Sequence, residues 1–457
     1  MKILVTILLI IPFLTRCNNS PLGQGVKEAK AKILSIGVSS VGVNSAGVVF
    51  QCSEESIGIV GYGSNYIDKF QTSLYPSKFH HFTLTGLNPE TGYLYTAYCG
   101  KSTFPIGFIQ AFTTLASDTF LATKQRSIWL IGGLGFGGSP VSEVDLFDPS
   151  TETWYSAFTN LPTPRAFPTV ISSGDNIYVM GGLILSGTTY STTNLVEAFN
   201  IKTNSWTIMN SMPNKLVGAV AGKVNEEIYI VGGSTTTGMT TGTILNTVYK
   251  FQPNVGTGGT WSQYTILGGS IPSRIDMAGC GNKGTIYLTG GRFYSSGLEQ
   301  SSSDGFIPAS NSSTSLIEAS ISQARHGSGS ACYEPISTDP YPNDTPALFV
   351  VGGSTLTDIH IPASSILTSS VFDYYPTGDT SNAVTASSSI PVALYYPALG
   401  ISYQKRKIYS FGGASSINNP TTNTYSLGLD SPKTNSWNTT TSMPRARFGH
   451  KAVGVNR

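Results

Sequence analysis

A short hydrophobic run that ends in two glycines recurs along this chain and constrains its fold more than any other feature. Apolar runs of this length are typical of strands that are buried on both faces. Glycine after such a run lets the backbone turn sharply and approach its neighbours where a Cβ atom would clash. The copies return about every 50 to 60 residues, which predicts a repeat architecture. They are IWLIGG (128–133), IYVMGG (177–182), IYIVGG (228–233), IYLTGG (286–291), LFVVGG (348–353) and IYSFGG (408–413).

A second strand, a turn and a tryptophan follow most of the glycine pairs, before a proline-containing segment opens the next unit. This order resembles the kelch repeat over roughly 340 residues. By that resemblance residues 116–457 form a six-bladed β-propeller, in which the tryptophans fill the gap between blades toward the rim. Their spacing of one per blade argues against an aromatic row that binds sugar. The tryptophans are Trp154, Trp206, Trp261 and Trp437.

Two long polar segments interrupt the regular pattern in blades four and five. They cover residues 294–315 and 354–367, and no tryptophan follows the glycine pairs of these two blades. Insertions of this kind map to loops, and the loops of propellers carry recognition. We therefore expect elaborated faces on blades four to six.

The C-terminal segment predicts how the ring closes. Residues 443–457, MPRARFGHKAVGVNR, have the form of the opening strand of a unit that has nothing behind it. The first glycine-pair unit, by contrast, is preceded by a poor match to such a strand. The simplest arrangement makes the C-terminal strand the innermost strand of the first blade, which seals the ring and leaves no open sheet edge.

Residues 31–115 lack the glycine-pair repeat and alternate differently. The segment LTGLNPETGYLYTAYC (84–99) resembles the stretch of a fibronectin type III domain around its tyrosine corner. By that resemblance these residues form a seven-stranded sandwich, with Tyr93 as the corner residue that hydrogen-bonds back to the chain. The predicted fold class is therefore all-β: a small fibronectin type III-like sandwich followed by a six-bladed kelch-type propeller.

The N-terminus has the features of an export signal. Residues 1–16 combine one lysine with an apolar stretch that is too short to span a bilayer. Cys17 follows at once, and residues 17–30 form a polar tether. This resembles a bacterial lipoprotein signal, which implies a lipid on Cys17 and an outer-membrane location, facing the surface or the periplasm. Arg16 stands where such signals prefer a small uncharged residue, so ordinary signal cleavage and an uncleaved anchor stay open. All three alternatives export the protein.

Export makes disulfides plausible for the cysteines that follow Cys17. Four remain, and they allow three pairings. By the fibronectin resemblance Cys52 ends one strand and Cys99 another on the facing sheet, which favours a Cys52–Cys99 bridge. The propeller reading places Cys280 and Cys332 on corresponding strands of adjacent blades, which favours the second bridge. Four buried free thiols are the alternative.

Composition and motifs argue against several functions. Charged residues make up 11% of the chain and the net charge is +2, so the sequence does not predict the basic surface that nucleic-acid binding requires. No cysteine and histidine spacing suits zinc, and no cofactor is implied. A nucleophile elbow, a phosphate loop and a carboxylate pair are also missing from the sequence. Copper radical oxidases share this type of propeller, but the adjacent pair His80 and His81 falls in the sandwich. The remaining histidines are His326, His360 and His450.

Aligning the blade openings on their prolines places Arg165, Arg325 and Arg447 at one equivalent position. The other blades carry Leu216, Ile275 and Leu394 there, with Arg274 one residue away. In animal kelch adaptors, arginines at this point stand at the mouth of the central channel and bind acidic peptides, which guanidinium groups suit through their bidentate forks. By that resemblance the ligand site consists of Arg165, Arg274, Arg292, Arg325, Arg447, Phe293, Tyr395 and Tyr396. The alternative is that these arginines only hold adjacent blades in register.

The resulting functional prediction is an exported, lipid-anchored monomer that binds a protein or an acidic glycan through the loop face of its propeller. A periplasmic sugar mutarotase of the sialic acid type is the alternative, since such enzymes are also six-bladed kelch proteins. Glu143, Glu197 and Glu299 are acids that such an enzyme could use, but no motif assigns them to catalysis. The sequence therefore favours a binding module over an enzyme.

Overall fold

The computed structural model describes residues 31–455, apart from 74, 101–108, 116, 238–242, 269, 283, 294–297, 311, 316–319, 336–345, 356–371, 377–383, 386–388, 417–418 and 433–434. The signal segment, Cys17, the tether and His360 therefore lie outside the described residues, as do parts of both polar insertions. Within the described ranges, no helix has the length and apolar character needed to span a membrane.

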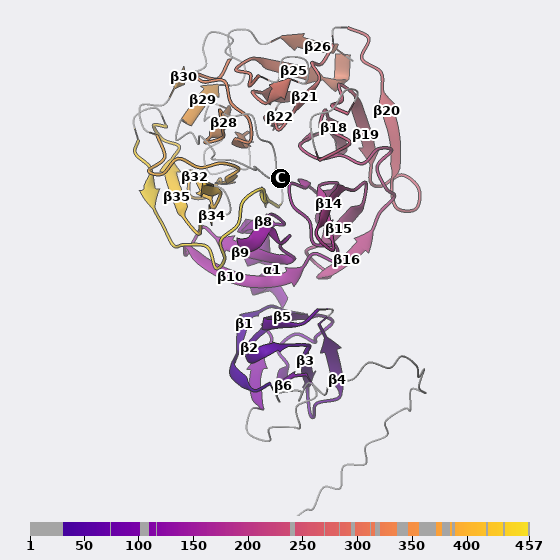
Figure 1. Ribbon diagram of the computed structural model, residues 1–457, viewed down its shortest axis with the longest axis vertical. Coiled ribbons are helices and arrows are strands. Elements are labelled where there is room, and N and C mark those ends of the chain that lie inside the picture. Colours follow the sequence, from indigo (N-terminus) through magenta and orange to yellow (C-terminus); the bar gives the residue numbers. More distant parts are fainter. Residues whose placement is uncertain are drawn as a thin grey trace, which may run out of the picture.

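Six four-stranded antiparallel sheets surround a common axis as the blades of a propeller (Figure 1). This confirms the predicted all-β propeller. Blade 1, from the axis outward, contains β37 (Lys451–Gly454), β8 (Ile128–Ile131), β9 (Glu143–Asp148) and β10 (Thr153–Asn160). Blade 2 contains β11 (Thr169–Ser173), β12 (Asn176–Met180), β15 (Val196–Asn200) and β16 (Ser205–Ile208). Blade 3 contains β17 (Val220–Val224), β18 (Glu227–Val231), β19 (Val248–Gln252) and β20 (Thr260–Tyr264).

The remaining three blades repeat this order, and the ring is closed. Blade 4 contains β22 (Ala278–Asn282), β23 (Thr285–Thr289), β25 (Ser303–Ile307) and β26 (Ser312–Ser315). Blade 5 contains β27 (Gly329–Tyr333), β28 (Ala347–Val351), β29 (Phe372–Pro376) and β30 (Val384–Thr385). Blade 6 contains β31 (Ala398–Ser402), β32 (Lys407–Phe411), β35 (Thr424–Gly428) and β36 (Asn438–Thr439). The C-terminal strand β37 pairs with β8, and the innermost strands of neighbouring blades contact one another all round the axis.

Short elements elaborate the propeller between its blade strands. The helix α1 (Ser117–Arg126) precedes β8, and the 3₁₀ helix η2 (Pro308–Ser310) follows β25. Between second and third strands lie η1 (Phe136–Gly138) in blade 1 and the hairpin of β13 (Leu183–Ser186) and β14 (Thr189–Thr192) in blade 2. Blade 4 adds β21 (Arg274–Ile275) paired with β24 (Arg292–Phe293), and blade 6 adds β33 (Ala414–Ser416) paired with β34 (Asn419–Pro420).

The N-terminal residues form a separate β-sandwich beside blade 1 (Figure 1). One sheet has the order β1 (Ile33–Val41), β2 (Ala46–Ser56) and β5 (Ser77–Leu84). The other has the order β4 (Lys69–Thr72), β3 (Gly58–Gly63), β6 (Gly92–Cys99) and β7 (Gln110–Thr113). Tyr93 is buried in the shared core, and its hydroxyl accepts a 2.9 Å hydrogen bond from the backbone N–H of Asn88.

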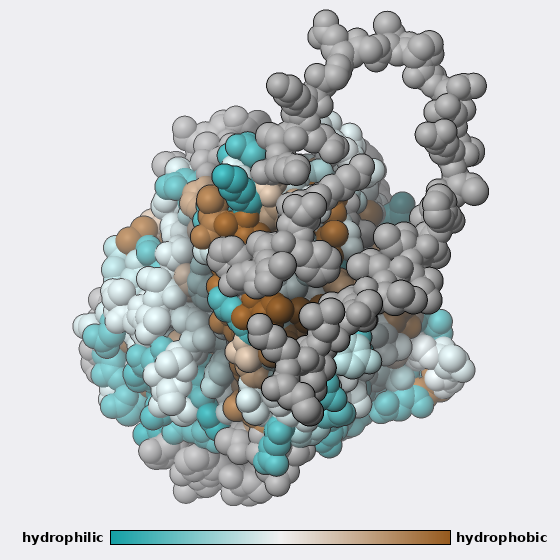
Figure 2. Space-filling view, turned by 90° about the horizontal axis from the view of Figure 1, so that it is seen from below, coloured by the Kyte–Doolittle hydropathy of each residue, from teal (hydrophilic) through white to brown (hydrophobic). Residues whose placement is uncertain are grey.

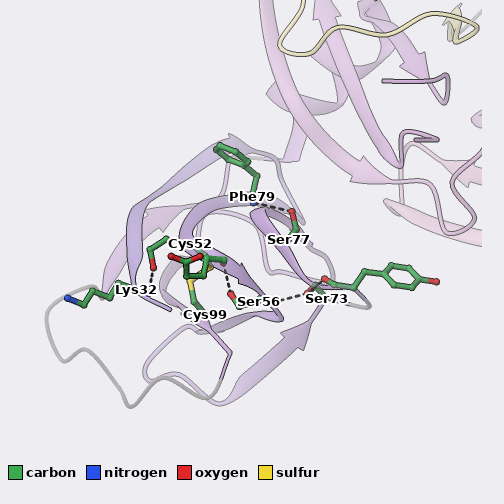
Figure 3. Close-up of a disulfide and its surroundings, with 11 residues drawn as sticks. Lys32, Cys52, Ser56, Ser73, Ser77, Phe79 and Cys99 are labelled. Carbon is green, nitrogen blue, oxygen red and sulfur yellow. Dashed lines mark hydrogen bonds between the residues drawn. A yellow bond between two sulfur atoms is a disulfide. The ribbon is translucent and has the colours of Figure 1, made fainter. Parts of the chain in front are cut away.

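Both candidate cysteine pairs are bonded in the structure. Cys52 on β2 and Cys99 on β6 join the two sheets inside the sandwich (Figure 3). Cys280 on β22 and Cys332 on β27 join the innermost strands of blades 4 and 5. Each bridge therefore links two separate sheets.

Large apolar side chains are exposed on the surface of the small domain. Leu34, Phe70 and Phe79 are each more than half exposed. Brown apolar surface is visible on the underside of the molecule, between hydrophilic residues (Figure 2). The sandwich therefore presents apolar surface in addition to the face that packs on the propeller.

The sheet of β1, β2 and β5 packs its outer face against β10 of blade 1. His81 of β5 lies in this interface, with its Nδ1 atom 3.4 Å from Oδ1 of Asn160 on β10. The pKa of His81 is lowered to about 4, mainly by burial; Glu143 opposes this shift and Arg445 adds to it. The imidazole is therefore neutral at pH 7 and remains neutral until the solution is strongly acidic.

This histidine predicts acid-sensitive docking of the two domains. The folded-state pKa lies below the unfolded value of about 6.5, so the unfolded chain binds the proton first as pH falls. Stability is therefore complete above pH 6.5 and declines toward pH 4. Between pH 7.5 and pH 5 we expect a loss of about 2 kcal/mol in the free energy of unfolding from this residue. Urea denaturation of wild type and His81→Gln at both pH values checks this, and an equal loss in the variant contradicts it.

The glycine pairs dock each blade onto the next, which is the physical reason for the repeated GG. Both glycines of every pair have positive φ, between 55° and 108°. The N–H of the second glycine donates a hydrogen bond to the carbonyl at the opening of the following blade, as from Gly133 to Arg165 at 3.0 Å and from Gly413 to Arg447 at 2.9 Å. A Cβ on the first glycine would collide there, at 2.6 Å from the Arg165 oxygen for Gly132. The pair therefore joins neighbouring blades through the backbone.

A ring of six equivalent residues closes the axis at the end where the second strands finish, which we call the hub end. All six have positive φ, between 48° and 68°. Backbone hydrogen bonds of 2.8 to 3.2 Å link five of the six neighbouring pairs, for example from Phe167 N–H to Gly449 O. Side chains alternate with glycines round the ring, so that each side chain occupies the space beside a glycine. The members of this hub ring, from blade 2 round to blade 1, are Phe167, Gly218, Asp276, Gly327, Tyr396 and Gly449.

Gly449→Ala is expected to destabilise the propeller by about 2 kcal/mol or more. An L-residue with φ near +63° costs about 1–2 kcal/mol, and the added Cβ would lie 2.3 Å from Cε1 of Phe167. Urea denaturation measures the effect. Gly454→Ala, at the end of β37, is the matched control, because its Cβ has open space and its φ is not positive. Equal stability of the two variants would contradict a tightly packed hub.

Candidate functional site

The structure corrects the expectation that the blade-opening arginines line an open mouth. Arg165, Arg274, Arg325 and Arg447 are all fully buried, with relative exposures of 0%. Each lies across its own blade at the hub end and is used by neighbouring protein groups. A ligand in solution cannot reach guanidinium groups in this position. Their role is structural, but the side chains hold their own blade together and do not bridge adjacent blades.

Arg165 shows the arrangement. Its guanidinium donates to the carbonyl of Leu195 at 3.1 Å and forms an ion pair with the carboxylate of Glu197 on β15. Burial lowers the pKa of Arg165 to about 10, which still leaves it charged at neutral pH. The positive charge of Arg165 is therefore neutralised by Glu197.

The other arginines repeat this pattern. Arg274 pairs with Asp304 on β25, and Arg447 pairs with Asp145 on β9. Arg325 donates to the carbonyl of Gly352 at 2.7 Å. Thus the arginines bind the blade's own glycine-pair carbonyl or its third strand instead of an external acid.

Arg274, not Ile275, occupies the equivalent position in blade 4. Its carbonyl accepts the hydrogen bond from Gly233, as the Arg165 carbonyl does from Gly133. The proline alignment failed here because Pro272 and Arg274 are separated by one residue fewer than in the other blades. Four of the six blades therefore carry arginine at this position, and blades 3 and 6 carry Leu216 and Leu394.

The sequence contained a signal for these pairs that the motif alignment missed. The third strand of each arginine blade has an acid at one equivalent register position, whereas the two leucine blades have tyrosine there. Leu216 and Tyr249 share one apolar cluster, and Leu394 and Tyr425 share another. The acids are Asp145, Glu197, Asp304 and Asp373. Comparing the repeats with one another predicts an internal partner for each arginine.

The remaining predicted ligand residues are also largely buried at the hub end. Arg292 lies 4.0 Å from Glu299, and Phe293 lies beside Arg274, whose Cζ is 5.7 Å from the ring centre. Tyr395 is fully buried, with its hydroxyl 3.4 Å from Nε2 of His326. Tyr396 belongs to the hub ring and donates its hydroxyl to Asp276, and both burial and Asp276 raise the pKa of Tyr396 well above its usual value. None of these side chains forms an accessible site with the others.

The three glutamates considered for catalysis are used by the protein in the same way. Glu143 binds Arg445 at 2.6 Å and Glu197 binds Arg165. Glu299 lies 3.5 Å from Nδ1 of His326. None of the three lines the axial cavity described next.

An axial channel of about 590 Å³ lies among the described residues. The innermost strands of all six blades form its wall, and α1 reaches it with Gln125 and Arg126. The hub ring closes one end, where a separate cavity of only about 20 Å³ remains beneath Phe167 and Tyr396. The channel extends from there toward the turns that join first and second strands, where Gln404 lies. It is therefore a blind pocket of the size of a small-molecule site.

Four charged side chains line this channel, namely Arg126, Lys223, Glu334 and Lys451, and the first two have an ion-pair partner. Arg126 is 2.7 Å from Asp148, and Lys223 is 3.3 Å from Glu226. Lys451 lies at the deep end, since it lines both the channel and the small hub cavity. Burial lowers the pKa of Lys451, while the carboxylate of Asp276 opposes this effect.

The hub end also presents a continuous outer surface built from the connections between second and third strands. The Tyr190 hydroxyl of β14 donates to the carbonyl of Gly138 in η1, which joins blades 2 and 1. Thr192 donates to the Thr235 carbonyl at 2.6 Å, which joins blades 2 and 3. Phe136 is 67% exposed and Leu185 is 36% exposed on this surface. We call these connections the hub-end surface.

Comparison with known proteins finds a match to one of these repeats. The Kelch motif model matches residues 164–213, which run from the opening of blade 2 to the start of blade 3. That stretch of the chain is thus similar to a kelch motif. Kelch-like protein 23 of Homo sapiens is 26% identical over 191 residues, which cover 41% of this chain and 30% of that protein. Kelch-like protein terF of Aspergillus terreus is 25% identical over 197 residues, which cover 41% of each chain.

Kelch repeat protein M-T8 of Myxoma virus is 27% identical over 120 residues, which cover 26% of this chain and 23% of that protein. The chain thus spans less than half the length of each of these relatives.

Proposed function

We propose that this protein is an exported interaction module whose kelch propeller binds a protein through its hub-end surface. The observation that carries the proposal is this surface itself: loops of adjacent blades are joined by hydrogen bonds and expose Phe136 and Leu185 above a closed hub. Rigid loops with exposed aromatic and aliphatic side chains are suited to protein recognition because little conformational entropy is lost on binding. An acidic glycan is a weaker candidate, because the buried arginines are already paired.

The N-terminal part is proposed to hold the propeller at a membrane. In this proposal residues 1–16 direct export, lipid on Cys17 anchors the chain and residues 17–30 form a tether. The sandwich then acts as a fibronectin type III-like spacer. Its three-stranded and four-stranded sheets and the Tyr93 hydrogen bond support that assignment.

Site-specific photocrosslinking in the source cells tests the binding surface. A benzoylphenylalanine at position 136 or 185 is expected to give one discrete adduct with a partner protein. Ile208 and Leu267, which are 74% and 81% exposed elsewhere on the propeller, provide matched control positions and should give no adduct. Equal adducts at all four positions, or none at the hub end, would contradict the proposed surface.

Metabolic labelling with an alkynyl fatty acid tests the anchor separately. Wild type is expected to take up the label and to sediment with membranes. Cys17→Ala should lose both properties while its propeller remains folded. An unlabelled wild-type protein would contradict lipidation and leave the propeller assignment intact.

A further inference from the structure

Lys451 is the unusual residue of the axial channel. It occupies the first position of its strand, directly opposite the residue that precedes the glycine pair. The same register position in the other blades holds small or uncharged residues, namely Thr169, Val220, Ala278, Gly329 and Ala398. One blade therefore places an ammonium group where the repeat elsewhere has none.

The surroundings of this ammonium leave it uncompensated at short range. Among the described residues, no ion pair or hydrogen bond joins the Lys451 side chain to another group. Asp276 is the acid that acts on it electrostatically, and that carboxylate already accepts the hydroxyl of Tyr396 in the hub ring. An ammonium that is partly withdrawn from water and has no direct partner is costly, and an anion placed beside it recovers part of that cost.

The channel wall suits a ligand with a polar, uncharged body. Small side chains such as Ala221, Gly281 and Ala331 form the middle of the channel, together with the hydroxyl of Ser330. The innermost strands pair only with the second strand of their own blade, so each directs one row of backbone N–H and C=O groups toward the axis. At the outer end Arg126 and Lys223 are already paired with acids, so the deep lysine is the distinctive cation.

We propose that the blind axial channel is a second binding site, which takes one carboxylate-bearing molecule with its carboxylate at Lys451. The ligand enters from the end opposite the hub-end surface, so this site is independent of the proposed protein-binding face. Its volume of about 590 Å³ admits either a free sugar acid or the last few residues of a peptide. Both sources offer the same group to the ammonium.

Isothermal titration calorimetry with matched probes tests the site. One pair is D-glucuronate and D-glucose, and the other is tetraalanine with a free or an amidated C-terminus. We expect one of the two acids to bind and its neutral counterpart to bind at least about tenfold more weakly, as for loss of a charged hydrogen bond. Glucuronate binding identifies a free acid as the ligand source, and tetraalanine binding identifies a chain end.

Lys451→Met tests the residue, and Lys223→Met at the outer end is the control. The first variant should weaken acid binding at least about tenfold, and the second should change it less than about twofold. Since methionine removes a partly buried charge and keeps the length of the side chain, Lys451→Met is also expected to retain or raise the melting temperature. Absence of acid binding to wild type at millimolar concentration, or equal binding by Lys451→Met, overturns the proposal. The photocrosslinking result does not depend on either outcome.

Discussion

Deletion of residues 445–457 is expected to abolish cooperative folding of the propeller at 25 °C. The deleted segment supplies β37, the innermost strand of blade 1, and with it four backbone pairs to β8. It also removes Gly449 from the hub ring and the Arg447 carbonyl that accepts the hydrogen bond of Gly413. Loss of the Arg447–Asp145 ion pair alone leaves a buried carboxylate, which costs about 3–5 kcal/mol. Folded domains are stable by only about 5–15 kcal/mol, so the combined loss exceeds what the fold tolerates.

Calorimetry and near-ultraviolet circular dichroism measure this outcome. Deletion of residues 456–457 alone is the control and should leave the melting temperature unchanged, because β37 ends at Gly454. A synthetic peptide of residues 443–457 is expected to restore the near-ultraviolet signal of the truncated chain. A truncated chain that melts at the wild-type temperature would refute closure of the ring by the C-terminal strand.

The sequence predicted the propeller well because its repeat is carried by backbone requirements. Each glycine pair has positive φ and lies against a carbonyl of the next blade, so glycine is needed wherever two blades meet. This makes the blade count and order visible as a regular pattern. The hub ring was not predicted, because its members are single positions from six blades with different side chains. Their shared property is a positive φ, as for Phe167 and Asp276, and side-chain identity does not reveal it.

The predicted ligand residues failed for a different reason. An arginine at a blade opening has the same sequence spacing whether its side chain faces solvent or lies across the blade. Whether the side chain is buried depends on the acid with which it pairs. Arg165 is buried because it pairs with Glu197, which lies on another strand. In the sequence, only the recurrence of an acid at this position in the other arginine blades indicates the contact. Lys451 was not predicted because it occurs in one blade only, and the alignment of the blades considered only residues that recur.

The internal variation between blades supplies a sharp test of the buried arginines. Arg165→Leu is expected to lower the free energy of unfolding by about 3–5 kcal/mol, because it leaves the Glu197 carboxylate buried without its partner. Blade 3 already uses leucine at this position, with Tyr249 at the position equivalent to Glu197. The double variant Arg165→Leu with Glu197→Tyr therefore converts the pair of blade 2 into that of blade 3.

The double variant should recover most of the lost stability, since the replacement is apolar and removes both charges together. Urea denaturation of the wild type, both single variants and the double variant gives the coupling energy between the two positions. An arginine that binds a ligand instead of an internal acid behaves differently, because its replacement would leave the free protein equally stable or more stable. Unchanged stability of Arg165→Leu would therefore return this residue to the candidate ligand site. A double variant less stable than either single one would show that the pairs of different blades are not interchangeable.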